Sequence, residues 1–219
     1  MGQYFPHEQL DVYGAAVKFA GLADELLRTW SRFWAVHDQF DRATESILVN
    51  MSKAARCRAT DQGIFNIECS LGSVLECAAC TDVALQRRLL ESQQVHSAKS
   101  LLQQIARMAV GLRTSWGGCV EEESAYYAKN ADIYFLHESL EVYQRSLEVH
   151  RKMDAIWGGS AVRKHHARRV DEFTTALTLN IAEGNGRFSM LDHKKFIVIA
   201  EDTGTKLATY LDVVGATSH

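Results

Sequence analysis

Residues 4–13 read Tyr-Phe-Pro-His-Glu-Gln-Leu-Asp-Val-Tyr, and residues 134–143 read Tyr-Phe-Leu-His-Glu-Ser-Leu-Glu-Val-Tyr. The second stretch follows the first by 130 residues (134 minus 4), and the same shift matches positions much further along the chain without a gap. It relates Asp24 to Asp154, Asp41 to Asp171, Thr44 to Thr174, Asn50 to Asn180, Ile67 to Ile197, Ala78 to Ala208 and Asp82-Val83 to Asp212-Val213. Self-similarity at a fixed spacing indicates a repeated structural unit. We therefore interpret the chain as a tandem duplication.

Apolar residues recur every three to four positions through seven segments, which predicts seven amphipathic helices. The expected helices span residues 7–33, 38–56, 61–85, 92–112, 137–157, 162–183 and 191–214. The only proline, Pro6, precedes the first segment, so no later residue lacks the amide donor that a helix needs. Because each apolar stripe can be buried only against other stripes, bundles are expected. The sequence predicts an all-α protein of two tandem up-and-down bundles, the first with four helices and the second with three.

The expected units are residues 1–113 and 134–219, joined by a linker at 114–133 that contains Gly117-Gly118 and the acidic run Glu121-Glu122-Glu123. Glycine and charge runs of this kind are typical of exposed connections. Gly184 directly follows an expected helix, where a left-handed glycine commonly ends it.

The repeat aligns His219 with Leu89, so no counterpart of the fourth helix follows the seventh. Either the chain is truncated or another element, in cis or from a partner, fills the open seam. We expect the last three helices to present an apolar groove.

Composition limits the class of protein. The 219 residues are 47% hydrophobic and carry a net charge of −3, which is ordinary for a globular domain and gives no general attraction to phosphate. No apolar run approaches the roughly 20 residues of a membrane span, and no signal peptide is visible. Five cysteines without a regular framework are typical of a reducing compartment. These features predict a cytoplasmic protein.

No catalytic or metal-binding pattern is recognisable. Cys77-x-x-Cys80 lies inside a helical segment, whereas the redox motif needs a helix N-terminus, so buried thiols are expected. His7-Glu8 and His137-Glu138 lack the second histidine four residues on that would complete a zinc face. We predict no catalytic residue, no metal, no cofactor and no small-molecule substrate.

The segment Asn180-Ile181-Ala182-Glu183-Gly184-Asn185-Gly186-Arg187 resembles the Asn-Ile-Ala-Glu-Gly signature of the four helix bundle protein family. That family includes proteins encoded in intervening sequences of 23S ribosomal RNA genes, and a related group comprises the accessory variability determinants of diversity-generating retroelements. Leu71 to Val83 is similar to the family's third helix, and Leu10–Tyr13 and Leu140–Tyr143 are similar to its first. The resemblance implies a bundle fold, self-assembly and, for the retroelement group, binding to a reverse transcriptase and nucleic acid.

Three basic clusters are candidate binding sites for nucleic acid or an acidic partner, because lysine and arginine supply phosphate contacts. Their residues are Arg163, Lys164, Arg168 and Arg169, then Lys53, Arg56 and Arg58, and finally Arg187, Lys194 and Lys195. A solvated helix end is the alternative interpretation, since cations are also favoured near helix C-termini.

Asn50 and Asn180 lie on the apolar stripes of the second and sixth segments. A buried amide needs a partner, so each is predicted to be a structural polar core residue that either fixes helix register or is satisfied locally.

Two functions remain open. The first is a non-catalytic adaptor or assembly protein that binds a reverse transcriptase and nucleic acid, as the resemblance implies. The alternative is a protein–protein scaffold without nucleic-acid binding, whose open three-helix unit accepts a partner helix.

Overall fold

The structure is a computed structural model that describes residues 5–117, 133–157, 164–186 and 189–217, without the side chains of 154–157, 164 and 217. The described residues contain helices and no strand, so the prediction of an all-α protein is confirmed. The elements are η1 (Pro6–Gln9), α1 (Asp11–Leu27), α2 (Ala35–Arg56), α3 (Asp61–Gln86), α4 (Ser92–Ser115), η3 (Leu136–Ser139), α5 (Glu141–Trp157), α6 (Lys164–Asn185) and α7 (Met190–Thr217).

The first and fifth helices begin later than the periodicity predicts, at Asp11 and Glu141. A short 3-10 turn precedes each of them, and Leu10 and Leu140 then adopt an extended backbone that separates turn from helix. Pro6 suits the first turn because its fixed φ is compatible with a helix start and its missing amide is not needed there.

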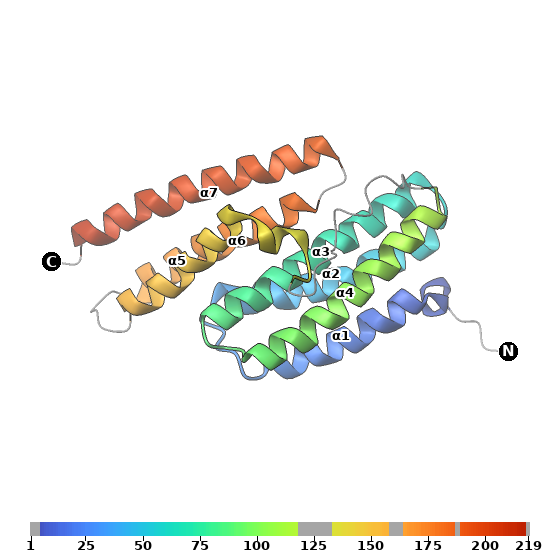
Figure 1. Ribbon diagram of the computed structural model, residues 1–219, viewed down its shortest axis with the longest axis horizontal. Helices are drawn as coiled ribbons and strands as arrows, with labels where there is room; N and C mark the ends of the chain where they lie inside the picture. The colour runs from blue at the N-terminus through green and yellow to red at the C-terminus, as the bar shows by residue number, and fades with distance from the viewer. Residues whose placement is uncertain (1–4, 118–132, 158–163, 187–188, 218–219) are drawn as a thin grey trace.

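The first four helices form a bundle in which α3 is the central element (Figure 1). α2 packs against α1 and α3, and α4 closes the bundle by packing against both α1 and α3. Buried apolar side chains such as Phe19, Phe40, Ile67 and Leu102 fill the interior. α3 has the length and hydropathy of a membrane span, but 72% of that window is buried inside the protein, which is the behaviour of a core helix.

The last three helices form an open layer with α6 between α5 and α7. Within the described residues α7 packs mainly on α6 and makes no comparable contact with α5. Figure 1 shows α7 along one edge of the molecule and α1 along the opposite edge. The second unit is therefore less enclosed than the bundle expected from the repeat.

Gly184 does not end its helix in a left-handed conformation, contrary to the sequence prediction. α6 continues to Asn185, and the positive-φ residues of the described chain do not include Gly184. A Cβ atom at Gly184 would lie 2.8 Å from the Cβ of Phe196 on α7. The glycine is needed because the two helices approach closely there.

The positions of the elements recur with the spacing seen in the sequence. η1 and η3 begin 130 residues apart (136 minus 6), as do α1 and α5 (141 minus 11). The ring contacts recur as well: Phe5 stacks on His7 at 5.7 Å between ring centroids, and Phe135 stacks on His137 at 5.9 Å.

Candidate functional site: the junction between the two helical units

The two units meet where α3 packs against both α5 and α6. One continuous apolar core crosses this junction, because Phe135, Tyr143 and Leu147 of the second unit are buried together with the interior of the first. The junction therefore joins the units by the same kind of packing that holds each of them together.

A buried ion pair marks one end of the junction. Arg87, directly after α3, places its guanidinium 2.7 Å from the carboxylate of Asp171 on α6, and both side chains are almost fully buried. The second oxygen of Asp171 accepts a hydrogen bond of 2.7 Å from the backbone amide of Ala35. Ala35 is the first residue of α2, whose N-cap, Trp34, offers no side-chain bond. Asp171 thus satisfies a helix N-terminus of the other unit, where a negative charge is favoured. The guanidinium also lies 4.6 Å from the centre of the Trp34 ring, a favourable cation–π contact.

A second network lies about one turn earlier along α3, around Lys99 of α4. Its ammonium is 2.5 Å from a carboxylate oxygen of Asp82 on α3 and 3.0 Å from one of Glu138 on η3. The hydroxyl of Tyr143 on α5 donates a 2.8 Å hydrogen bond to the other oxygen of Asp82. Burial lowers the pKa of Lys99, but the two carboxylates outweigh it and the net shift is upward. Burial raises the pKa of Glu138, which Lys99 only partly opposes.

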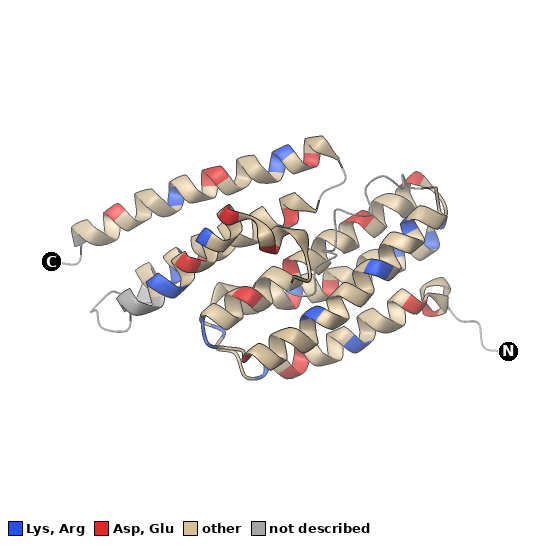
Figure 2. Cartoon of the chain, in the orientation of Figure 1, with Lys and Arg blue, Asp and Glu red and all other residues tan. Residues whose placement is uncertain are grey.

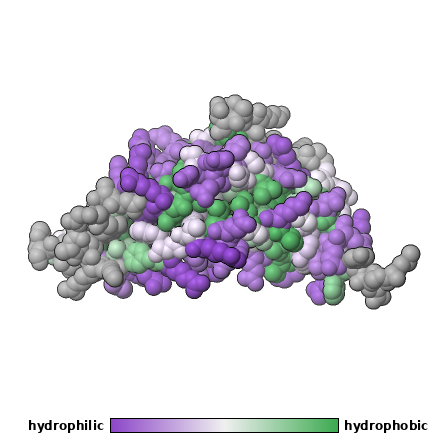
Figure 3. All heavy atoms as spheres, turned by 90° about the horizontal axis from the view of Figure 1, so that it is seen from below, coloured by the Kyte–Doolittle hydropathy of each residue, from purple (hydrophilic) through white to green (hydrophobic). Residues whose placement is uncertain are grey.

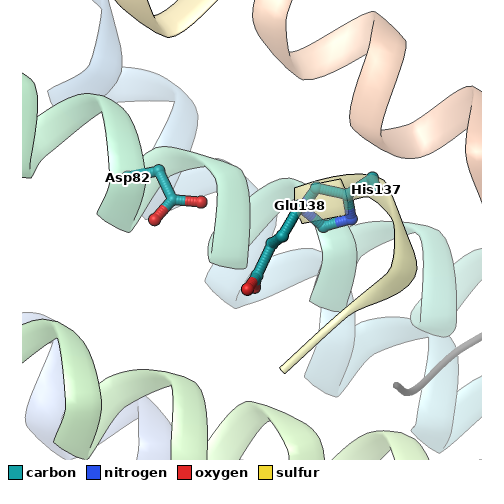
Figure 4. Close-up of side chains that lie close together, drawn as sticks. All are labelled: Asp82, His137 and Glu138. Atoms are coloured by element: carbon teal, nitrogen blue, oxygen red, sulfur yellow. The ribbon is translucent and has the colours of Figure 1, made fainter. Parts of the chain in front are cut away.

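Asp82, His137 and Glu138 could offer ligand atoms to a metal ion, since these atoms lie within 4.8 Å of one another. Figure 4 shows Asp82 projecting from α3 and the other two side chains from η3. Lys99 already pairs with both carboxylates, so a metal cation would have to displace a paired ammonium. Burial lowers the pKa of His137 to about 3, and neither ring nitrogen has a hydrogen-bond partner among the described residues. The cluster is best described as a structural network of paired charges.

The predicted basic residues do not converge on one surface. Arg168 and Arg169 are exposed near the start of α6 and both pair with Glu172. Arg168 also lines a polar pocket of about 420 Å³ together with Arg32, Asp38 and Asp41.

Lys194 and Lys195 are exposed on α7, beyond the opposite end of α6, and a helix of 22 residues is about 33 Å long. Lys53, Arg56 and Arg58 are exposed at the end of α2 and just after it. Arg163 and Arg187 lie outside the described residues, as does the side chain of Lys164. Figure 2 shows blue and red segments interspersed along the helices, without one large basic face.

The two asparagines are partly buried and satisfied within their own helices. The amide of Asn180 donates to the carbonyl of Ala176 at 2.7 Å, and that of Asn50 donates to the carbonyl of Ser46 at 3.0 Å. Local satisfaction is the simpler of the two predicted roles, and the register role stays a prediction. The prediction of buried thiols is confirmed, because Cys77 and Cys80 lie buried within α3 and burial raises the pKa of both.

Sequence reasoning missed the residues that hold the junction together. Asp82 and Asp171 each have an aspartate at the matched position of the other copy, which was a usable signal. Arg87 shows no such match, since position 217 is threonine, and no match of this kind pointed to Lys99. Only their partners in the tertiary structure identify them.

Comparison with protein families places the first unit. Residues 8–111 match the model of the 23S rRNA-intervening sequence protein family. This confirms the resemblance read from the sequence over the four-helix bundle, which η1 and α1 to α4 form. No curated protein matches the chain, and no solved structure matches it.

Proposed function

We propose that this protein is a non-catalytic helical assembly module whose α7 accepts a helix from a protein partner. The observation that carries the proposal is a difference between two matched helices. Ile67 and Ala78 of α3 are fully buried in a bundle that α4 completes, whereas their counterparts on α7, Ile197 and Ala208, are exposed.

Further apolar side chains support a docking surface on α7. Met190 and Leu191 are 80% and 81% exposed, and Val198 is 53% exposed. Val198 is the counterpart of Glu68 on α3, and Glu68 pairs with Arg113 of α4 at 2.9 Å. Val198 therefore lies on the side of α7 that corresponds to the α4-facing side of α3. Clustered apolar exposure of this kind is typical of interaction sites, and Lys194 and Lys195 would form a basic rim beside it.

The experiment uses a fluorescent peptide of residues 92–115, the α4 sequence, as the probe helix for the full chain. We expect the anisotropy to show saturable binding, and we expect Val198→Glu to weaken it about tenfold or more because a charge would be buried. Val49→Glu is the matched control, since Val49 is an exposed apolar residue on α2 and should not affect binding. Absence of binding, or equal loss in the two variants, would contradict the proposal.

A second candidate is the nucleic-acid adaptor that the retroelement resemblance implies. Its support is that Lys194 and Lys195 are exposed and form no salt bridge within the described residues. Gel shifts with RNA and DNA at low and moderate salt separate the candidates, because phosphate contacts weaken steeply with salt. Binding that is lost in Lys194→Glu/Lys195→Glu and kept in Arg168→Glu/Arg169→Glu would favour this candidate, whereas no shift at low salt would remove it.

A further inference from the structure

The helix pair of unit two that packs against α3 has a matched helix pair, α1 and α2, on unit one. α3 packs against α5 and α6, and the side chains of His150, Asp171, Thr175 and Thr178 on these helices are buried. The 130-residue shift relates them to Ala20, Asp41, Glu45 and Leu48 of α1 and α2. These four residues line an open groove of about 280 Å³ between α1 and α2.

Matched positions are therefore covered in one copy and uncovered in the other, and the aspartate is the residue that the two copies share there. Asp171 is buried against Arg87, while its counterpart Asp41 is exposed and forms no ion pair within the described residues. Phe135 and Tyr143 are fully buried at the junction, while Phe5 is 68% exposed and Tyr13 is only partly buried. Figure 3 looks at the molecule from the α1 side and shows hydrophobic side chains gathered between hydrophilic ones.

The groove has an apolar floor and an acidic rim. Ala20, Ala23 and Leu48 supply small and aliphatic surface, and Asp41 and Glu45 supply negative charge. Asp24, also on the rim, pairs with Arg28 at 2.6 Å. A helix that fits this groove needs small or aliphatic residues along one stripe and a basic residue near its end. Within this chain, α3 and Arg87 provide these features to α5 and α6. Helix-in-groove recognition of this kind uses an apolar stripe for affinity and flanking charges for orientation.

We infer that the groove between α1 and α2 docks a basic-ended helix of the α3 type from a different protein. A second copy of this chain suits it less well. The α3 of a second copy is already enclosed by α2, α4, α5 and α6, and α7 exposes Asp202 and Asp212, which would meet the acidic rim. The inference rests on the proposed assembly role, but it concerns a different surface from the one proposed on α7.

The test measures binding of a fluorescent peptide with the sequence of residues 72–88, which contains Arg87, to the full chain. We expect saturable binding, because the site for this helix on α5 and α6 is filled in cis while the groove on unit one is open. Asp41→Arg should weaken binding about tenfold or more, and a peptide carrying Glu in place of Arg87 should restore it. Glu25→Arg is the matched control, because Glu25 is exposed on another side of α1 and makes the same charge change.

Circular dichroism and melting temperature establish that each variant is folded. No binding to the folded wild-type chain, or equal weakening by Asp41→Arg and Glu25→Arg, would overturn the inference. Concentration-dependent dimers in sedimentation that Asp41→Arg abolishes would also overturn it, because the occupant would then be a second copy. If the groove binds no peptide but α7 still binds its probe helix, the inference fails and the proposed function stands.

Discussion

Arg87 and Asp171 are the most completely buried ion pair that the described residues form. Removing one member of such a pair leaves an uncompensated charge in a low-dielectric interior, which typically costs about 3–5 kcal/mol, whereas removing both members costs far less. We predict that Asp171→Leu destabilises the protein by that amount and that adding Arg87→Met recovers most of the loss.

A double-mutant cycle in urea measures the coupling. The matched single control is Asp41→Leu, whose carboxylate is exposed, and its effect should stay within about 0.5 kcal/mol. Additive effects of Arg87→Met and Asp171→Leu would show that the pair is not coupled.

His137 makes stability depend on pH. Its pKa falls from an ordinary 6.5 to about 3 because it is buried, so the unfolded chain binds the proton more readily than the folded one. The stabilising contribution is complete above pH 6.5 and is lost as the pH falls from 6.5 toward 3. We predict that His137→Phe gains about 2 kcal/mol more over wild type at pH 5 than at pH 7.

Urea denaturation at both pH values measures this difference. The control is His7→Phe, which changes the half-buried counterpart of His137 and should leave the loss of stability between pH 7 and pH 5 as in wild type. An unchanged acid limb in His137→Phe would show that this histidine is not the titrating group. Burial also lowers the pKa of His150, so part of the loss of stability at acid pH should remain in His137→Phe.

Lys99 holds two carboxylates that would otherwise repel each other. We predict that Lys99→Met destabilises the protein by about 3–5 kcal/mol at pH 8 and by clearly less at pH 5. The reason is that Glu138, whose pKa burial already raises, can then be protonated. Urea denaturation of wild type and Lys99→Met at both pH values checks this prediction. A loss in the free energy of unfolding that is the same at pH 8 and pH 5 would contradict it.

At the scale of elements, the α6–α7 pair depends on one close approach. A methyl group at Gly184 would meet the Cβ of Phe196 at 2.8 Å, whereas one at Gly204 would meet only the end of Leu177 at 3.9 Å. We predict that Gly184→Ala costs about 1–3 kcal/mol through overpacking and that Gly204→Ala is neutral or slightly stabilising. Thermal denaturation of both variants decides it, and equal melting temperatures would refute the packing argument.

The existence and type of the helices followed from the sequence, because a 3.6-residue apolar period is a local property. Their starts were less accurate where a 3-10 turn precedes α1 and α5, since such turns also bring residues three apart onto one side. Gly184 shows the same limit. Its role depends on Phe196, twelve residues away, and a helix-ending glycine and a close-contact glycine are identical in sequence.

At the scale of the whole molecule, the helices differ in how much covers them. α3 is packed by α2, α4, α5 and α6, whereas α7 packs mainly on α6. Local opening is easiest where few buried contacts hold an element. We predict that amide hydrogen exchange is slowest in α3 and fastest, among the long helices, in α7, with α5 intermediate. Protection of α7 equal to that of α3 would mean that another element covers it in solution.

The sequence by itself determined that this chain is all-helical, where most helices lie and that its two halves share one pattern, because periodicity and repetition are carried by neighbouring residues and by simple alignment. Only the tertiary structure decided which copy of that pattern is covered. Asp41 and Asp171, or Phe5 and Phe135, are the same residues in the same local setting, but one of each pair faces solvent and the other lies at the junction. Burial, pairing with Arg87 or Lys99 and the shifted pKa values of Glu138 and His137 all depend on which distant surface packs against each residue, and the local sequence carries no record of that surface.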